Sequence, residues 1–251
     1  MERSEFLKRG FSSLLGVVAL SACTNSTPIN PASTTTAAAG GTPSGGSTNG
    51  SSASDCSVTP AETAGPFPTK QPANFVRRDI TDGRTGVPMT MNLTIKNAGN
   101  GCAALAGVLV DVWHCDKDGY YSEYGGGGMQ NANYQGVDFL RGRQTTDANG
   151  VAGFTTIFPG WYPGRAPHIH VHIYTAAGTS LLVTQIAFPA DVTSAVYTTP
   201  EGKAKGYTKG AQDTSNARDN VFSDGYATEL ATLSGSVAAG YTLTHTIVVK
   251  G

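Results

Sequence analysis

The chain has 251 residues, of which 17 are Lys or Arg and 18 are Asp or Glu, so its formal net charge is −1. This balance leaves no basic stripe, which argues against a nucleic-acid-binding protein. Charged residues make up only 14% of the chain while glycine is abundant, a composition that suits a β-sandwich with many loops. The length fits one all-β domain or two smaller domains.

The first 55 residues carry signals for export rather than for folding. Residues 1–23 combine a basic start, a short apolar run and the sequence LSAC at 20–23, which resembles a bacterial lipobox. Cys23 is therefore the expected lipidation site, and the apolar run is too short for a permanent transmembrane helix. Residues 24–54 carry no charge, so we expect a flexible tether over residues 24–55. We expect an exported protein, held by this lipid anchor on the periplasmic or extracellular side of a membrane.

The expected folded domain spans residues 56–251, and its hydrophobic periodicity predicts strands. Residues 89–95 alternate apolar and polar side chains, whereas residues 107–114 form a nearly continuous apolar run, typical of a central strand buried on both faces. Residues 189–226 show no period, and a short helix is predicted around 227–233. Strands without long intervening helices indicate an all-β fold, an antiparallel β-sandwich with long irregular loops. Further strands are predicted at 140–145, 153–157, 168–174, 181–188 and 241–249, with a hairpin turn at 147–150.

Three cysteines fall in this domain, in a compartment that permits disulfides. Cys102 and Cys115 flank one extended strand, which would hold them roughly 30–40 Å apart at about 3.3 Å per residue. They are poor partners for that reason. Cys56–Cys102 is the preferred bridge and Cys56–Cys115 the second choice, and either pairing leaves one thiol free.

The richest chemical signal lies at residues 159–174, which read PGWYPGRAPHIHVHIY. In the strand predicted from residue 168, His168, His170 and His172 point to one face. Such a row could be the solvent face of an edge strand, but tyrosines here and upstream favour a metal site. Imidazole suits iron, copper and zinc. Phenolate is a hard anionic donor, so two tyrosines with two histidines would point to Fe(III).

Four stretches, in this order, resemble the intradiol ring-cleavage dioxygenases, the family of catechol 1,2-dioxygenase and protocatechuate 3,4-dioxygenase. The resemblance implies that Tyr121, Tyr162, His168 and His170 bind a non-haem Fe(III). It also implies that Arg165 and, more weakly, Gln185 stabilise negative charge on the substrate ring. The stretches are TPAETAGPF at 59–67, DVWH to GYYS at 111–122, PGWYPGRAPHIH at 159–170 and VTQ at 183–185.

The resemblance also implies the reaction. A catechol binds through both oxygens, Tyr162 leaves the iron, and O2 attacks the activated ring between the two hydroxyl-bearing carbons to give a muconate-type diacid. The chain departs from the catechol 1,2-dioxygenases in lacking a recognisable N-terminal helical dimerisation domain, and it is closer to a secreted, apparently lipidated branch. The substrate and the oligomeric state stay open.

Two other classes of protein remain as alternatives. A non-catalytic, surface-tethered β-sandwich binding module would explain the anchor and the glycine content but not the tyrosine and histidine set. A zinc- or copper-binding exported protein would use the histidines without needing both tyrosines. Outside the four ligands, we expect His172 at the rim or the surface and His114 in a supporting or core position.

Overall fold

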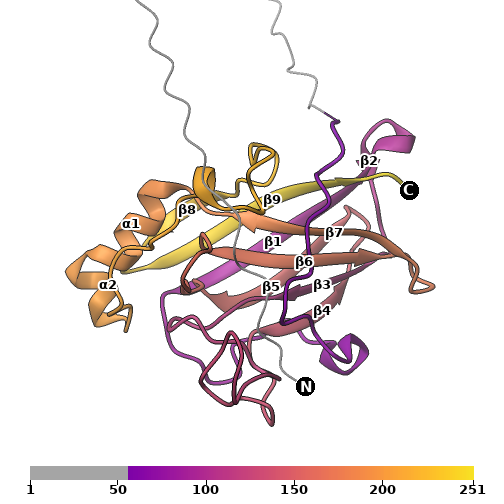
Figure 1. Ribbon diagram of the computed structural model, residues 1–251. Helices are drawn as coiled ribbons and strands as arrows, with labels where there is room; N and C mark the ends of the chain where they lie inside the picture. Colours follow the sequence, from indigo (N-terminus) through magenta and orange to yellow (C-terminus); the bar gives the residue numbers. More distant parts are fainter. Residues whose placement is uncertain (1–55) are drawn as a thin grey trace, which may run out of the picture. The chain divides into compact units, whose positions relative to one another are not determined.

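The computed structural model describes residues 56–251, so the predicted signal segment, Cys23 and the tether lie outside the described residues. The described chain is mostly β-structure, with short helices grouped at one end (Figure 1). The helices are α1 (Ala190–Thr198) and α2 (Pro200–Ala204), with 3-10 turns at Pro72–Phe75, Ala98–Asn100 and Asn216–Arg218. The strands are β1 (Pro88–Asn97), β2 (Ala103–Ala104), β3 (Leu109–Trp113), β4 (Arg141–Thr145), β5 (Val151–Ile157), β6 (His168–Tyr174), β7 (Ser180–Ala187), β8 (Thr232–Ser236) and β9 (Gly240–Val249).

The strands form two sheets in a sandwich-like arrangement, which confirms the predicted fold class. One sheet has the order β4-β3-β6-β7, and the other has the order β2-β1-β9-β8 with β5 also paired to β1. Every named strand pair is antiparallel except β1 with β9, which run parallel. The sheet that will carry the site is thus wholly antiparallel, with β6 between β3 and β7.

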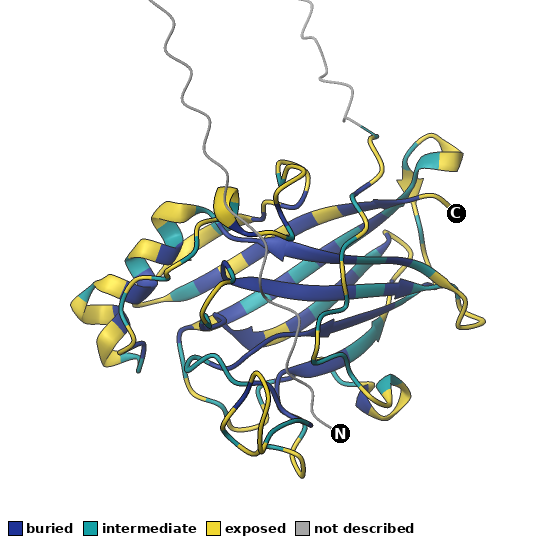
Figure 2. Ribbon diagram, in the orientation of Figure 1, coloured by how far each residue is buried: buried dark blue, intermediate teal, exposed yellow. Residues whose placement is uncertain are grey.

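The core lies between the sheets and follows the alternation of the strands. In β6, Ile169, Val171 and Ile173 are fully buried in this core, together with alternate residues of β1 and β9. Because successive side chains point to opposite faces, the histidines of β6 must point away from the core. Figure 2 shows the central strands buried along most of their length. The outer face of β6 is covered as well, since His168 and His170 are also buried.

Two predictions about the C-terminal third were wrong. No helix forms at residues 227–233; instead β8 pairs with β9 from Thr232 onward. The stretch 189–226, predicted to be irregular, contains both α1 and α2. The sequence of α1 shows no clear helical period, but the helix is stabilised by tertiary packing, because Val196 and Tyr197 are buried in the core cluster.

The predicted turn at 147–150 is present but does not make a hairpin. The Asp147 carboxylate accepts hydrogen bonds from the backbone N–H groups of Asn149 and Val151, each at 2.9 Å. The flanking strands belong to different sheets, since β4 pairs with β3 and β5 pairs with β1. The turn therefore carries the chain from one sheet to the other, which its local chemistry alone could not reveal.

Cys56 and Cys102 form a disulfide with their Cα atoms 5.8 Å apart. Cys115 is the free thiol of the described chain and is buried. The bridge fastens the start of the described chain to the loop between β1 and β2.

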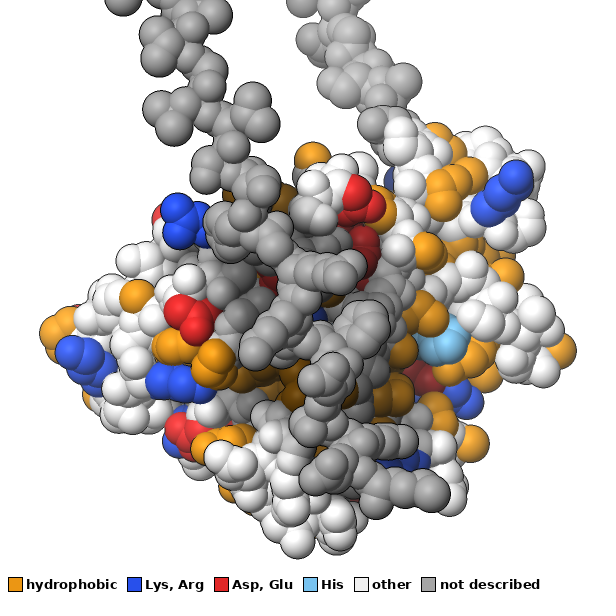
Figure 3. Space-filling model, in the orientation of Figure 1, with side chains coloured by type: hydrophobic (Ala, Val, Ile, Leu, Met, Phe, Trp, Pro, Cys, Tyr) orange, Lys and Arg blue, Asp and Glu red, His pale blue; other side chains and the backbone are white. Residues whose placement is uncertain are grey.

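On the face shown in Figure 3, the lysine and arginine side chains of the described residues lie scattered rather than in a stripe. Within residues 56–251, no helix is both long and apolar enough to cross a membrane.

Candidate active site

Three of the four predicted ligands meet at one point beside β6. The Nε2 atom of His168 lies 3.2 Å from the Tyr121 hydroxyl and 3.1 Å from the Tyr162 hydroxyl. His170 follows on the same face of the strand, with its ring centroid 4.8 Å from that of His168. Three separate segments of the chain thus bring two phenols and two imidazoles together.

Tyr121 reaches this point from the loop after β3 and is held firmly there. Its backbone N–H donates to Oε1 of Gln130 at 2.7 Å, and Nε2 of Gln130 donates back to the Tyr121 carbonyl at 2.9 Å. Its ring stacks on Phe67, with centroids 4.8 Å apart. The side chain of Tyr121 is only 1% exposed. Gln130 therefore fixes its backbone and Phe67 fixes its ring, and neither contact was predicted from the sequence.

Tyr162 reaches the same point from the turn between β5 and β6. The preceding Gly160 is required, because a Cβ there would collide with the carbonyl groups of Asp116 and Lys117. The Gly160 N–H also donates to the Asp116 carbonyl at 3.0 Å. Through this close approach the turn that carries Tyr162 packs on the turn that leads to Tyr121.

His170 is enclosed on two sides. The indole of Trp113, its neighbour across the β3–β6 ladder, stacks on the imidazole with centroids 4.8 Å apart and planes 2° from parallel. On another side the N-terminal segment closes in, since a Cβ at Gly65 would lie 3.1 Å from Cε1 of His170. The GPF sequence at 65–67 thus covers His170 with Gly65 and Tyr121 with Phe67.

Burial sets the protonation states of these groups. Burial, aided by the Arg165 charge, lowers the pKa of His168 to about 3. Burial and the neighbouring His168 lower the pKa of His170 well below its ordinary value. Burial raises the pKa of Tyr162 to about 12 and the pKa of Tyr121 well above its ordinary value. Both imidazoles are therefore neutral at neutral pH, the form in which histidine binds metals.

This donor set fits a metal ion. Among the described residues, no group of three or more His, Cys, Asp or Glu side chains is placed to hold a metal, so any metal here needs the tyrosine oxygens. Buried phenols resist ionisation because nothing offsets the lost hydration of the phenolate. A cation at the point where Tyr121, Tyr162 and His168 meet would supply that offset.

Arg165 and Gln185 lie beside these donors and contact each other. Nη2 of Arg165 donates to Oε1 of Gln185 at 2.6 Å, and Nε2 of Gln185 donates to the Thr63 carbonyl at 2.8 Å. Nε of Arg165 donates to both carboxylate oxygens of Asp219, at 2.9 Å each. Sequence reasoning missed Asp219, which is fully buried. It lies in the stretch without periodicity, where no pattern singled it out.

Arg141 was also missed, although it supports the Tyr121 segment. This side chain is 1% exposed and pairs with Glu123, with Nε 3.1 Å from Oε2. It also donates to the carbonyls of Ser122 and Phe67, at 2.7 and 3.0 Å. A single buried guanidinium therefore joins the segment after Tyr121 to the segment that covers it.

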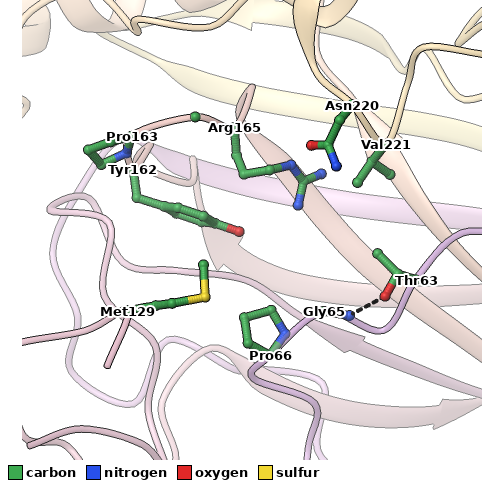
Figure 4. A pocket seen from close by; sticks show the side chains of 10 residues that line it. Thr63, Gly65, Pro66, Met129, Tyr162, Pro163, Arg165, Asn220 and Val221 are labelled. Atoms are coloured by element: carbon green, nitrogen blue, oxygen red, sulfur yellow. Dashed lines mark hydrogen bonds between the residues drawn. The ribbon is translucent and has the colours of Figure 1, made fainter. Parts of the chain in front are cut away.

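A cavity of about 480 Å³ is lined by one of the four donors, Tyr162. Tyr162 and Arg165 form one part of its lining, Met129 and Pro66 face them, and Val221 lies on the far side (Figure 4). The figure shows the Tyr162 hydroxyl turned into this space. A substrate in the cavity would therefore meet Tyr162 and Arg165 directly.

The remaining histidines of interest lie elsewhere. His172 hydrogen-bonds through Nε2 to the Ser180 hydroxyl at 2.8 Å, and its ring stacks on Tyr174 with centroids 3.8 Å apart. His114 is buried, with Nε2 2.7 Å from the Thr156 hydroxyl. Each of these imidazoles has its own local partner and neither joins the donor cluster.

The chain and its structure are similar to known dioxygenases. A protein-family model described as dioxygenase matches residues 68–199, more than half of the chain. The structure is similar to the intradiol ring-cleavage dioxygenase from Tetranychus urticae, with a TM-score of 0.67 and 25% identity over 78% of this chain and 95% of that one. It is also similar to the dioxygenase domain of a dioxygenase–carbohydrate-binding protein fusion from Streptomyces sp. SirexAA-E, with a TM-score of 0.54 and 26% identity over 77% of this chain and 99% of that one.

Hydroxyquinol 1,2-dioxygenase from Pseudomonas putida DLL-E4 shares the fold, with a TM-score of 0.50 and 16% identity over 77% of this chain and 67% of that one. The matched residues 68–199 include Tyr121, Tyr162, His168 and His170. The match, the fold and the four converging side chains agree, and the chain belongs to the intradiol ring-cleavage dioxygenase family.

Proposed function

We propose that the protein is a non-haem Fe(III)-dependent intradiol dioxygenase that opens a catechol-type ring with O2 and forms a cis,cis-muconate-type diacid. One observation carries the proposal. The hydroxyls of Tyr121 and Tyr162 lie within 3.2 Å of Nε2 of His168 beside a cavity. A non-catalytic binding module would have no need for this convergence, and membership of a dioxygenase family does not favour one.

In this proposal Tyr121, Tyr162, His168 and His170 hold the iron. Two anionic oxygen donors and two neutral imidazoles suit a hard trivalent cation. When bound, a ferric ion supplies the Lewis acidity that makes a chelated catecholate reactive toward O2. The burial of both imidazoles and of Tyr121 keeps competing water away from the site.

The side chains of the cavity then prepare the substrate. Tyr162 lines the cavity, and its hydroxyl faces the open space. Its phenolate oxygen is thus the donor of the proposed set that faces an entering substrate, placed to take the proton from a substrate hydroxyl at Oη. Arg165, held by Gln185 and Asp219, presents a fixed donor toward negative charge that develops on the ring.

Export and membrane attachment form a separate part of the proposal. The LSAC sequence at 20–23 and the uncharged stretch behind it support lipidation of Cys23, outside the described residues. Mass spectrometry of the N-terminal peptide should find acyl chains on Cys23. A mature protein that begins elsewhere, or an unmodified Cys23, would refute this part without affecting the site.

The test of the enzyme begins with the metal. The purified protein should contain about one iron per chain and be red-brown, because tyrosinate-to-Fe(III) charge transfer absorbs visible light. His170→Gln should lose iron. His172→Gln, a change on the same strand face but outside the donor cluster, is the matched control and should keep it.

The second measurement is the product. Catechol and O2 should give a ring-opened diacid that has gained both oxygen atoms, with the ring cut between the hydroxyl-bearing carbons. A colourless protein that binds zinc, or a coloured protein with copper in place of iron, would overturn the proposal. So would an iron protein that cuts the ring outside the two hydroxyls.

A further inference from the structure

The cavity contains a charged side chain whose charge is already compensated. Arg165 is the only charged side chain among the described residues that line the cavity. Its Nε lies 2.9 Å from both oxygens of Asp219, and this carboxylate is fully buried. The cavity therefore presents a guanidinium to the substrate, but the pair as a whole is neutral.

Asp219 is buried and is held in this position by several hydrogen bonds. Besides Arg165, it accepts hydrogen bonds from the backbone N–H groups of Ala166 at 2.6 Å and Val221 at 2.9 Å. Ala166 directly precedes the Pro-His segment that begins β6, and Val221 lines the cavity. The carboxylate thus ties the cavity wall at 220–221 to the turn that carries Arg165.

The same contacts decide which donor of Arg165 remains for a ligand. Nε is directed to Asp219 and Nη2 to Gln185, the latter at 2.6 Å. Nη1 makes no hydrogen bond with another described side chain or backbone group, so its two N–H groups, together with the second N–H of Nη2, are left for a substrate oxygen. Arg165 can orient a neutral catechol by this hydrogen bond, yet it has no uncompensated charge to offer a ring carboxylate.

We propose that Asp219 acts as a positioning residue that makes this cavity select catechols without an anionic ring substituent. The inference rests on the proposed dioxygenase function and names its substrate class. A carboxylate that enters the cavity must lose water without gaining a free cationic partner, which is costly. A hydrogen, alkyl, halogen or hydroxymethyl group at the same ring position avoids this cost. Selection then arises from a penalty on the wrong substrate as much as from contacts with the right one.

The first experiment uses the iron-loaded full chain without O2. Calorimetric titration compares 3,4-dihydroxybenzoate with 3,4-dihydroxybenzyl alcohol, which is similar in size but neutral. We expect the neutral ligand to bind at least about tenfold tighter, by analogy with discrimination based on one unpaired polar group. Equal affinities, or tighter binding of the carboxylate, would overturn the inference.

The second experiment changes the compensating charge. Asp219→Asn leaves the Arg165 charge uncompensated, so the affinity ratio between the two ligands should shift about tenfold toward the carboxylate. Asp219→Glu keeps the charge and should retain the preference for the neutral ligand, while its longer side chain lowers kcat. The matched control is Asp213→Asn, which removes an exposed carboxylate that bonds the Gly164 N–H at 3.2 Å and should shift the ratio less than twofold.

Asp219→Asn could also disturb the fold, so its thermal transition is measured beside the wild type. If it weakens both ligands equally and leaves their ratio unchanged, Asp219 is only structural and the inference is wrong. If Asp219→Asn does not fold, the wild-type comparison still tests the selection, and Asp219→Glu tests the part of Asp219: a ratio that moves toward the carboxylate in this charge-conserving variant would contradict it. A protein that opens no catechol ring refutes the proposed function, whereas one that opens both ligands' rings equally well refutes only the selection proposed here.

Discussion

The two tyrosine segments reach the same imidazole from very different supports. Tyr121 is clamped by Gln130 through its backbone and by Phe67 through its ring, and it is almost fully buried. Tyr162 lies in a turn whose next two residues, Pro163 and Gly164, are exposed, and its side chain forms part of the cavity lining. This difference in support leads us to expect unequal roles for the two proposed donors, with Tyr121 fixed and Tyr162 free to move when a ligand enters.

The sharpest way to break this comparison is to remove each hydroxyl in turn. We expect Tyr121→Phe to lose its iron or most of its colour, because a fixed donor disappears from a buried site. We expect Tyr162→Phe to bind iron but turn over poorly. Iron content and visible absorbance, with and without catechol, measure both variants. If Tyr121→Phe kept its iron and activity while Tyr162→Phe lost the metal, the roles would be reversed.

The next largest effect is expected from removing Arg141, which supports the Tyr121 segment. Arg141→Met removes the ion-pair partner of the buried Glu123 carboxylate and leaves it only the hydrogen bond from the Lys70 N–H, so the free energy of unfolding should fall by about 3–5 kcal/mol. Urea unfolding measures it. The matched control, which contacts the segment that carries Tyr162, is Lys209→Met. This variant loses an exposed hydrogen bond to the Trp161 carbonyl, and its free energy of unfolding should fall by less than about 1 kcal/mol. Similar losses of unfolding free energy in both variants would contradict the conclusion that the Tyr121 segment is held more firmly than the Tyr162 segment.

The disulfide should affect stability without affecting either tyrosine. It closes a sequence separation of 46 residues, so replacing Cys56 and Cys102 together by Ala should lower the free energy of unfolding by about 2–4 kcal/mol. Because neither cysteine contacts the donor cluster, the folded variant should keep its iron. Denaturant titration and metal analysis check the two halves of this prediction, and a folded variant without iron would refute the second.

The smallest effect expected is a pH dependence that arises in the other sheet. His245 of β9 shares the core-facing side of its strand with Leu243 and Ile247, and burial lowers its pKa to about 4. Between pH 6.5 and 4 the unfolded chain binds a proton at this residue that the folded chain does not, so stability falls as the pH falls. One proton contributes at most about 1.4 kcal/mol per pH unit.

The measurement is the free energy of unfolding at pH 7 and pH 5 for the wild type and for His245→Gln. The variant should lose less stability over this range, by about 1–2 kcal/mol. Its absolute stability is irrelevant to the test, because only the change with pH is compared. An identical pH dependence in both proteins would mean that His245 does not contribute.

Local periodicity was sufficient for much of the fold. The strand predicted at 168–174 is β6 to the residue, and the apolar run at 107–114 contains β3. These segments were predictable because alternation, or burial on both faces, is imposed on each strand by its own sheet. The helix predicted at 227–233 failed because pairing with β9 outweighed the local preference of that stretch.

The sequence by itself determined the chemical identity of the site: a histidine strand, two tyrosine motifs and an arginine, each in a short contiguous stretch. Only the tertiary structure decided what supports them. Gln130 on Tyr121 and Asp219 on Arg165 are single polar residues in loops, and Arg141 is the first residue of β4; no motif marks any of them. Their partners are brought close by the packing of two sheets and long loops. Such contacts depend on the whole fold, so no local pattern of the sequence encodes them.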